Sequence, residues 1–472
     1  MTELTISLDG LSGKPLYEQI YDHIKNEIQR GGLPFKERLP STRKLAQYLQ
    51  VSRSTVDMAY EQLISEGYIE AVPCRGYFVC EVSGLYESPV PVREAKSRPR
   101  EEQPHYRYDF SPNGVDLKSF PYNAWRKLSK TVLMDDSSEL FMLGDPSGEE
   151  RLKTTIAAHL HRARGVNVRP EQIVIGAGTD YLLMLLQVLL PGRRRIAMEN
   201  PTYKKAYQVL KNLGNDMCVI DMDGSGMEVE KLKASGAEIA YVMPSHQYPL
   251  GTVMPISRRL KLLGWAYERE ERYLIEDDYD SEFRYKGKPI PALQGYDRQG
   301  KVIYLGTFSK SIAPAIRVSF LVLPERLLAV YQERGRAFSS TVSRVDQMIV
   351  AAFLEEGYYE RHLNKMRAIY KGRHDLLLEG LREIKGIEVT GENAGVHLLV
   401  HFQNGLTEEE AIERAAKAGI RVYGLSAYYV TEKEKETKPT VILGYANIEE
   451  HEIREAASLL KHAWENKKTA QP

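Results

Sequence analysis

The sequence is poor in cysteine, with only Cys74, Cys80 and Cys218 among 472 residues. These three residues show neither a C-x-x-C spacing nor histidine partners at metal-ligand intervals, which argues against a disulfide framework and against a zinc site. Reduced thiols of this kind are typical of a protein that stays in the cytosol.

Long apolar runs and a secretory leader are also missing. The first ten residues, MTELTISLDG, contain no basic segment followed by an apolar core. The longest apolar run, from Tyr181 to Leu190, is too short and too broken to span a bilayer. We therefore expect a soluble, cytoplasmic protein without a membrane partner.

An excess of charge of either sign is absent, because 64 basic residues balance 64 acidic ones. Any surface that binds nucleic acid must therefore be local. Hydrophobic residues make up 43% and charged residues 27% of the chain, which is an ordinary globular composition. A chain of 472 residues exceeds what one hydrophobic core usually supports, so we expect several domains.

The first eighty residues predict a compact α+β module. Apolar residues recur at helical spacing from Leu16 to Ile28, and Ser41 and Ser52 stand at positions where they can cap further helices. The predicted elements are helices over residues 16–28, 42–49 and 53–66 and two short strands within 68–80.

Positive charge is concentrated inside this module. Six basic residues stand against one acid, Glu37, between Arg30 and Arg53. A helix that enters the major groove needs polar residues at its N-terminal end, with cations nearby to hold phosphates. Solvated arginines on an ordinary three-helix bundle are the alternative. The candidate DNA-binding residues are Arg38, Ser41, Arg43, Arg53, Ser54, Thr55, Arg75 and Gly76.

A boundary is predicted over residues 81–106, which are rich in proline, serine and charge and lack apolar periodicity. From 107 to 340, short apolar strands alternate with helical stretches, a pattern typical of a largely parallel α/β sheet. We expect strands at 172–175, 195–198, 239–243, 272–275, 302–305 and 318–323.

Residues 341–472 predict a separate, smaller α+β domain. A long helical stretch from Asp346 to about Leu381 precedes strands near 395–401 and 441–445. The predicted fold is thus multidomain, with an N-terminal winged helix-turn-helix, an α/β large domain and a C-terminal small domain.

Polar residues follow five of the expected strands, where the carboxyl ends of parallel strands bring ligand-binding groups together. Lys310 stands in GTFSK, and Asp277 and Tyr279 stand in EDDYD. Gly178 and Thr179 open a helix whose amides can seat an anion, with Thr307, Ser309 and Arg317 to complete the seat. The remaining candidates are Tyr203, His246 and Gln247.

This set meets the demands of pyridoxal phosphate: a lysine for the Schiff base, an acid for the pyridine nitrogen, a hydroxyl at O3′ and anion donors for the phosphate. Tyr203 is placed to stack on the ring, and His246 and Gln247 to contact O3′ or the ring. Taken singly, each residue has a plainer role as a turn or helix cap, a packed aromatic or a core histidine. Their coincidence favours the cofactor.

The segment from Pro15 to Val79 resembles a GntR-type winged helix, with RLPSTRKLA, VSRSTV and GYFV as its most specific parts. The strand-end residues resemble those of fold-type I aminotransferases. Together they resemble the MocR branch of GntR regulators over nearly the whole chain, similar to its GABA-responsive and pyridoxine-biosynthesis members. The resemblance implies an operator-binding, domain-swapped head-to-tail homodimer, with Lys310 as the Schiff-base lysine, Asp277 and Tyr279 on the ring and Arg317 on the phosphate.

The resemblance also has a gap. GABA-responsive members hold the effector carboxylate with two arginines, where this chain has Lys204 or Lys205 and Ala427. The effector is therefore predicted to be another amine or amino acid, or pyridoxal phosphate itself, and its binding to alter operator recognition. Two alternatives are a working aminotransferase with an accessory DNA-binding domain, and a regulator whose large domain has lost its cofactor.

Overall fold

The computed structural model describes residues 6, 8–9, 13–82, 106–134, 138–285, 289–392, 394–431 and 438–465. The chain divides into two compact units, residues 1–102 and 103–472, which are considered separately. Most of the predicted linker, from 83 to 105, lies outside the described residues. In the described ranges, no helix has both the length and the apolar character that crossing a bilayer requires.

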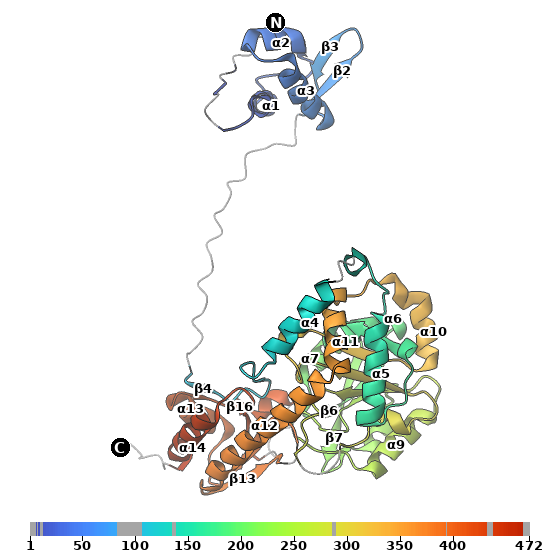
Figure 1. The fold of residues 1–472 in the computed structure, drawn as a ribbon, viewed down its shortest axis with the longest axis vertical. Helices are drawn as coiled ribbons and strands as arrows, with labels where there is room; N and C mark the ends of the chain where they lie inside the picture. The colour runs from blue at the N-terminus through green and yellow to red at the C-terminus, as the bar shows by residue number, and fades with distance from the viewer. Residues whose placement is uncertain are drawn as a thin grey trace. The chain divides into compact units, whose positions relative to one another are not determined.

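The N-terminal unit is a three-helix module with a small sheet (Figure 1). Ser41 and Ser52 cap the second and third helices by accepting hydrogen bonds from the amides of Lys44 and Thr55, as predicted. The sequence did not indicate the first strand, which is only two residues long. The elements are α1 (Leu16–Gln29), β1 (Arg38–Leu39), α2 (Thr42–Leu49), α3 (Arg53–Ser65), β2 (Ile69–Val72) and β3 (Gly76–Val79), with strand order β1-β3-β2.

The larger unit is built on an eight-stranded sheet, and all six strands predicted for it are present. The strands are β5 (Ile173–Gly176), β6 (Arg195–Asn200), β7 (Asp216–Asp223), β8 (Gly226–Met227), β9 (Ile239–Val242), β10 (Tyr273–Asp278), β11 (Val302–Thr307) and β12 (Ser319–Val322). Their order is β5-β12-β11-β10-β9-β6-β7-β8. The central pairs from β11 to β7 are parallel, whereas β12 runs antiparallel to both neighbours.

Helices bury both faces of this sheet, which is why its strands read as continuous apolar runs. In β11, Ile303 packs in one cluster with Leu182 and Leu327, and Tyr304 packs in the cluster on the other side. The helices of this part are α4 (Tyr122–Met134), α5 (Glu150–Arg164), α6 (Thr179–Leu189), α7 (Lys204–Asn212), α8 (Val229–Ala234), α9 (Ile256–Tyr267) and α10 (Glu325–Arg334).

The C-terminal part has a second, antiparallel sheet with the order β13-β14-β17-β16. The helix predicted over 346–381 is two helices, because Gly357 adopts a left-handed φ of 71° between them. Figure 1 shows the second, α12, running from α11 toward β13. The elements are α11 (Arg344–Glu355), α12 (Tyr358–Arg382), β13 (Ile387–Thr390), β14 (His397–Phe402), α13 (Glu408–Lys417), β15 (Ile420–Arg421), β16 (Tyr423–Gly424), β17 (Thr440–Gly444) and α14 (Glu450–Glu465).

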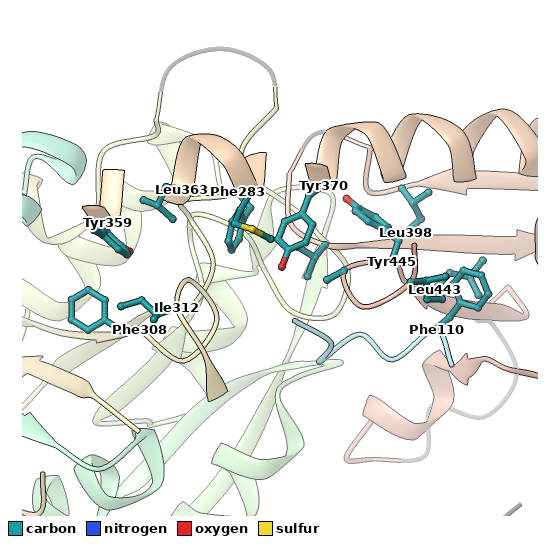
Figure 2. Packing of buried hydrophobic residues seen from close by; sticks show 14 of the residues in the cluster. Phe110, Phe283, Phe308, Ile312, Tyr359, Leu363, Tyr370, Leu398, Leu443 and Tyr445 are labelled. Carbon is teal, nitrogen blue, oxygen red and sulfur yellow. The ribbon is translucent and has the colours of Figure 1, made fainter. Parts of the chain in front are cut away.

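One continuous core joins the two sheets of the larger unit (Figure 2). Phe308 packs edge-on against Tyr359 of α12, with ring centroids 5.7 Å apart, and Phe283 packs in the same way against Tyr370, at 5.1 Å. The short strand β4 (Tyr108–Asp109) pairs with β15, which fixes the start of this unit against its C-terminal part. The loop that carries residue 310 is therefore anchored on packed aromatic residues.

Candidate cofactor site and nucleic-acid interface

A pocket of about 140 Å³ lies at the carboxyl ends of the large sheet, where residues follow β5, β9, β10 and β11. Nine of the cofactor-binding candidates from the sequence contribute to its wall. They are Gly178, Thr179, Tyr203, Asp277, Tyr279, Thr307, Ser309, Lys310 and Arg317.

Lys310 lies in the turn after β11, which is shaped by a hydrogen bond of 3.1 Å from the Ser309 amide to Thr307 Oγ1. Its amine, Nζ, donates to the carbonyl oxygen of Pro112 at 3.3 Å and to Asn113 Oδ1 at 3.4 Å. Burial lowers the pKa of this amine to about 8. Lys310 therefore has a larger neutral, nucleophilic fraction near neutral pH than an exposed lysine.

Asp277 is a buried carboxyl group on β10, only 5% exposed. Burial raises its pKa to about 7, although the Tyr241 hydroxyl donates a hydrogen bond that favours the charged form. A protonated ring nitrogen brought beside this carboxyl would restore its negative charge, because an opposite charge lowers the pKa of a buried acid. The site thus suits a heterocyclic cation.

Tyr279 reaches the pocket from the turn after β10, and its hydroxyl lies 2.9 Å from His246 Nδ1. The same nitrogen lies 2.9 Å from Asp280 Oδ2, and both His246 and Asp280 are almost fully buried. His246 therefore lies behind Tyr279 and does not line the pocket as the sequence suggested. Gln247 does not line it either, since its amide donates to the carbonyl of Pro201 at 2.9 Å.

The residue after Gln247 is the one that the turn directs into the pocket. Tyr248 packs edge-on against Tyr203, with centroids 6.0 Å apart, and its hydroxyl donates to Tyr428 Oη at 3.0 Å. Tyr428 belongs to the late loop that contains Ala427, and its carbonyl accepts the Thr202 amide at 3.1 Å. The sequence could not show this contact, because about 180 residues separate the two tyrosines.

An anion seat forms where α6 begins. Gly178 has a φ of 94° and precedes the first turn of the helix, so amides and the positive end of the helix dipole face the pocket. Arg317 packs closely there, because a Cβ on residue 178 would lie 2.2 Å from its Nη2. Nη2 donates to the Ala177 carbonyl at 2.8 Å and to Asp180 Oδ1 at 2.6 Å. This combination fits a phosphate group.

The sequence missed Asn113 and Asp180, which also line the pocket. Asp180 directly follows Thr179 in GAGTD, so its place in the first turn of the helix was an available signal. Asn113 lies far away in the chain and carried no signal. Together, the amine, the buried acid, the hydroxyl groups and the anion seat fit pyridoxal phosphate.

The N-terminal unit carries the predicted DNA-binding residues on β1, at the starts of α2 and α3, and at the turn between β2 and β3. Arg53 and Ser54 are exposed at the start of α3, and Arg43 is exposed near the start of α2. Arg38 on β1 lies against the tip of the wing, since a Cβ on Gly76 would be 3.4 Å from its Nε. Tyr60 of α3 donates to the carbonyl of Pro40 at 3.0 Å, which ties α3 to the segment just before α2.

Comparison with known proteins assigns both units. The family "Bacterial regulatory proteins, gntR family" matches residues 16–79, and the family "Aminotransferase class I and II" matches residues 111–460. These matches define a class of protein: a DNA-binding transcriptional regulator that carries a pyridoxal-phosphate-dependent aminotransferase-like domain.

Full-length relatives have the same organisation. The chain is 39% identical to the uncharacterized HTH-type transcriptional regulator YhdI of Bacillus subtilis over 98% of both chains. It is 32% identical to the probable rhizopine catabolism regulatory protein MocR of Rhizobium meliloti, over 97% of this chain and 95% of that protein. It is 29% identical to the pyridoxine biosynthesis regulator PdxR of Corynebacterium glutamicum, over 91% and 92%. The chain belongs to the MocR-type regulators of the GntR family.

The larger unit is similar to solved aminotransferases. The kynurenine aminotransferase of Pyrococcus horikoshii, whose structure is a complex with the amine form of the cofactor, matches with a TM-score of 0.67 and 27% identity. The match covers 78% of this chain and 93% of that one. An archaeal alanine:glyoxylate aminotransferase matches with a TM-score of 0.68 and 25% identity, over 76% and 91%. The regulator therefore has a fold-type I aminotransferase domain that binds pyridoxal phosphate.

Proposed function

We propose that the regulator senses a primary amine, an amino acid or pyridoxal phosphate itself through Lys310 and that occupancy of this site changes operator binding. Bound pyridoxal phosphate would supply an aldehyde carbon, and a primary amine could replace the lysine amine on that carbon. The proposal rests on one observation. A lysine with a lowered pKa, a buried acid and an anion seat all line the same pocket.

Each pocket residue has a proposed task. Lys310 carries the cofactor as a Schiff base, and Asp277 holds the proton of the ring nitrogen. Tyr279 donates to O3′, Tyr203 covers one face of the ring, and Arg317 binds the phosphate. The seat is completed by Gly178, Thr179, Thr307 and Ser309.

The pocket offers little support for a pair of arginines that would hold the carboxylate of a bound amino acid, as in aminotransferases. Among the described residues that line the pocket, the cations are Lys205, Lys310 and Arg317, and two of these interact with Asp180. Ala427, in the late loop, supplies no charge. An effector whose recognition does not depend on a bidentate guanidinium pair therefore fits best, which suits a simple amine or the cofactor itself.

The DNA contacts are proposed for the exposed ends of the helix-turn-helix and for the wing. Arg53, Ser54 and Thr55 would face base edges in the major groove, because they open the second helix of the motif. Arg38, Arg75 and Gly76 would contact an adjacent groove or backbone from the wing. Ser41 and Arg43 would contact phosphates.

A homodimer is proposed for the larger unit, with the head-to-tail, domain-swapped arrangement implied by the family. Support comes from a strip of exposed apolar side chains around the end of α4 and the segment after it, where Phe141 is 77% and Leu143 90% exposed. Apolar exposure on this scale is unusual for a monomer and is typical of a protein interface. The strip comprises Leu133, Met134, Phe141, Met142 and Leu143.

The sensing proposal is tested by covalent capture. Wild-type protein loaded with pyridoxal phosphate should show visible Schiff-base absorbance, and borohydride should fix the cofactor on the peptide that contains Lys310. Lys310→Ala should lose both signals, while Lys204→Ala, a neighbouring lysine outside the pocket wall, should keep them. Operator affinity should change with cofactor or amine in wild type and not in Lys310→Ala. An unchanged response in Lys310→Ala would overturn the proposal.

A further inference from the structure

Asp180 places a negative charge inside a seat that must hold a phosphate. Its Oδ1 accepts a hydrogen bond of 2.6 Å from Arg317 Nη2, and its Oδ2 lies 3.5 Å from Lys205 Nζ. All three residues line the pocket. Both cations at this end of the pocket thus share one carboxylate partner.

The Asp180 carboxylate is charged at neutral pH. Burial alone would raise its pKa, but the hydrogen bond and charge of Arg317, together with the charge of Lys205, outweigh burial and lower the pKa below its ordinary value. A dianionic phosphate group in this seat therefore meets the two cations Arg317 and Lys205 together with the anion Asp180. Without Asp180, it would meet the two cations alone. Repulsion between the carboxylate and the phosphate weakens binding, and it grows as the bound ligand excludes water.

The backbone at the start of α6 favours the position of the Arg317 guanidinium beside Asp180. Arg317 has a left-handed φ of 52°, and its guanidinium packs against Gly178 so closely that a side chain there would clash. Nη2 is also held by the Ala177 carbonyl at 2.8 Å. The Ala177 carbonyl and the Asp180 carboxylate thus both accept from Nη2, so a phosphate at the start of α6 shares this nitrogen with a carboxylate.

We propose that Asp180 is a positioning residue that weakens the phosphate seat, so that pyridoxal phosphate exchanges and its occupancy follows its concentration. A permanently bound cofactor needs no such opposing charge, whereas a ligand that acts as a signal must leave when its concentration falls. This inference rests on the proposed function, because it assigns the same pocket the task of reporting the cofactor.

The plainer role for Asp180 is to stabilise the start of α6, where an acidic side chain interacts favourably with the helix dipole. Asp346 offers a matched comparison, since it is an exposed aspartate in the first turn of α11 and does not line the pocket. A purely structural role predicts similar, small losses of stability for Asp180→Asn and Asp346→Asn, with no change in ligand affinity.

The test is a titration of full-length protein with pyridoxal phosphate and with pyridoxal, which has the same aldehyde but no phosphate. Asp180→Asn should bind pyridoxal phosphate about tenfold more tightly than wild type, and this gain should shrink as salt is added. Pyridoxal affinity should stay within about twofold. Asp180→Glu, which keeps the charge, and Asp346→Asn should behave like wild type.

Inorganic phosphate gives a second readout that does not depend on the Schiff base. It should compete with pyridoxal phosphate more strongly in Asp180→Asn than in wild type. Equal or weaker binding of pyridoxal phosphate by Asp180→Asn, or an equal gain for pyridoxal, would overturn the inference while leaving the proposed function intact. Failure of wild type to form any Schiff base at Lys310 would instead overturn the proposed function.

Discussion

The hydroxyl of Tyr248 donates to the hydroxyl of Tyr428 at 3.0 Å, and this bond ties the late loop of the C-terminal part to the wall of the cofactor pocket. The backbone reinforces the contact, because the Thr202 amide donates to the Tyr428 carbonyl at 3.1 Å. A loop held by a few polar contacts can open locally without unfolding the sheet below it. This loop is thus suited to respond to what the pocket holds.

Loss of the Tyr428 hydroxyl should loosen this loop. Tyr428→Phe leaves the buried Tyr248 hydroxyl without its acceptor, which costs about 1 kcal/mol and should raise loop opening about fivefold. Hydrogen exchange of the Thr202 amide measures this opening, because that amide is protected by the Tyr428 carbonyl. Tyr429→Phe is the control and should leave the exchange rate unchanged. Equal protection in Tyr428→Phe and wild type would show that the hydroxyl pair does not hold the loop.

The pH dependence of Schiff-base formation should report the lowered pKa of Lys310. The neutral amine is the nucleophile, so the rate with pyridoxal phosphate should rise about tenfold per pH unit below pH 8 and level off above it. Stopped-flow absorbance between pH 6.5 and 9.5 measures this profile, with butylamine as the reference for an ordinary amine. A rate that keeps climbing beyond pH 9.5 would mean that burial does not shift this lysine.

Much of this arrangement was accessible from the sequence because short apolar strands and their polar ends follow local rules. The six strands expected for the large sheet are present, and Asp277, Tyr279 and Lys310, which were selected because they stand at strand ends, line one pocket. β7 was missed because it is half-buried and begins and ends with aspartate, so its sequence lacks the continuous apolar run by which the other strands were predicted. β8 and β1 are only two residues long and depend on their neighbours.

Two predicted site residues, His246 and Gln247, lie outside the pocket wall for a different reason. His246 and Gln247 were expected in the pocket because they follow β9, yet which residue of a turn faces a ligand depends on its backbone path. Tyr248 takes that place, and its partner Tyr428 comes from a distant loop. Contacts between segments so far apart are set by tertiary packing, which no local pattern records.

Arg53 is expected to contribute directly to operator binding. Its side chain is 68% exposed at the start of α3, and its Nε lies 3.4 Å from Asp57 Oδ2. Arg53→Ala should weaken binding by about 1–3 kcal/mol, and a phosphate contact would also reduce the salt dependence by about one ion. The measurement uses a duplex selected from a random library with wild-type protein. Arg30→Ala, an exposed arginine after α1, should change affinity less than twofold.

Cofactor uptake separates loss of DNA contact from misfolding in that experiment. Arg53→Ala should bind pyridoxal phosphate with wild-type affinity, since the substitution lies in the other compact unit. Equal operator affinity in wild type and Arg53→Ala would refute the assignment of this helix end to DNA.

Replacement of the apolar strip should separate the proposed dimer. Phe141 and Leu143 expose 77% and 90% of their surface. Burying two such side chains in an interface contributes about 3–6 kcal/mol to the free energy of association. The double substitution Phe141→Glu with Leu143→Glu should therefore raise the dissociation constant at least about a hundredfold. Sedimentation velocity at micromolar concentration should then find a dimer for wild type and a monomer for the double variant. Leu260→Glu, at a leucine that is 52% exposed on α9, is the matched control and should remain dimeric. Because dimer formation stabilises the folded chain by mass action, the separated variant should melt below the control at equal concentration, while its far-ultraviolet circular dichroism before melting should match that of the control. A wild-type monomer, or a double variant that stays dimeric, would move the interface away from this strip.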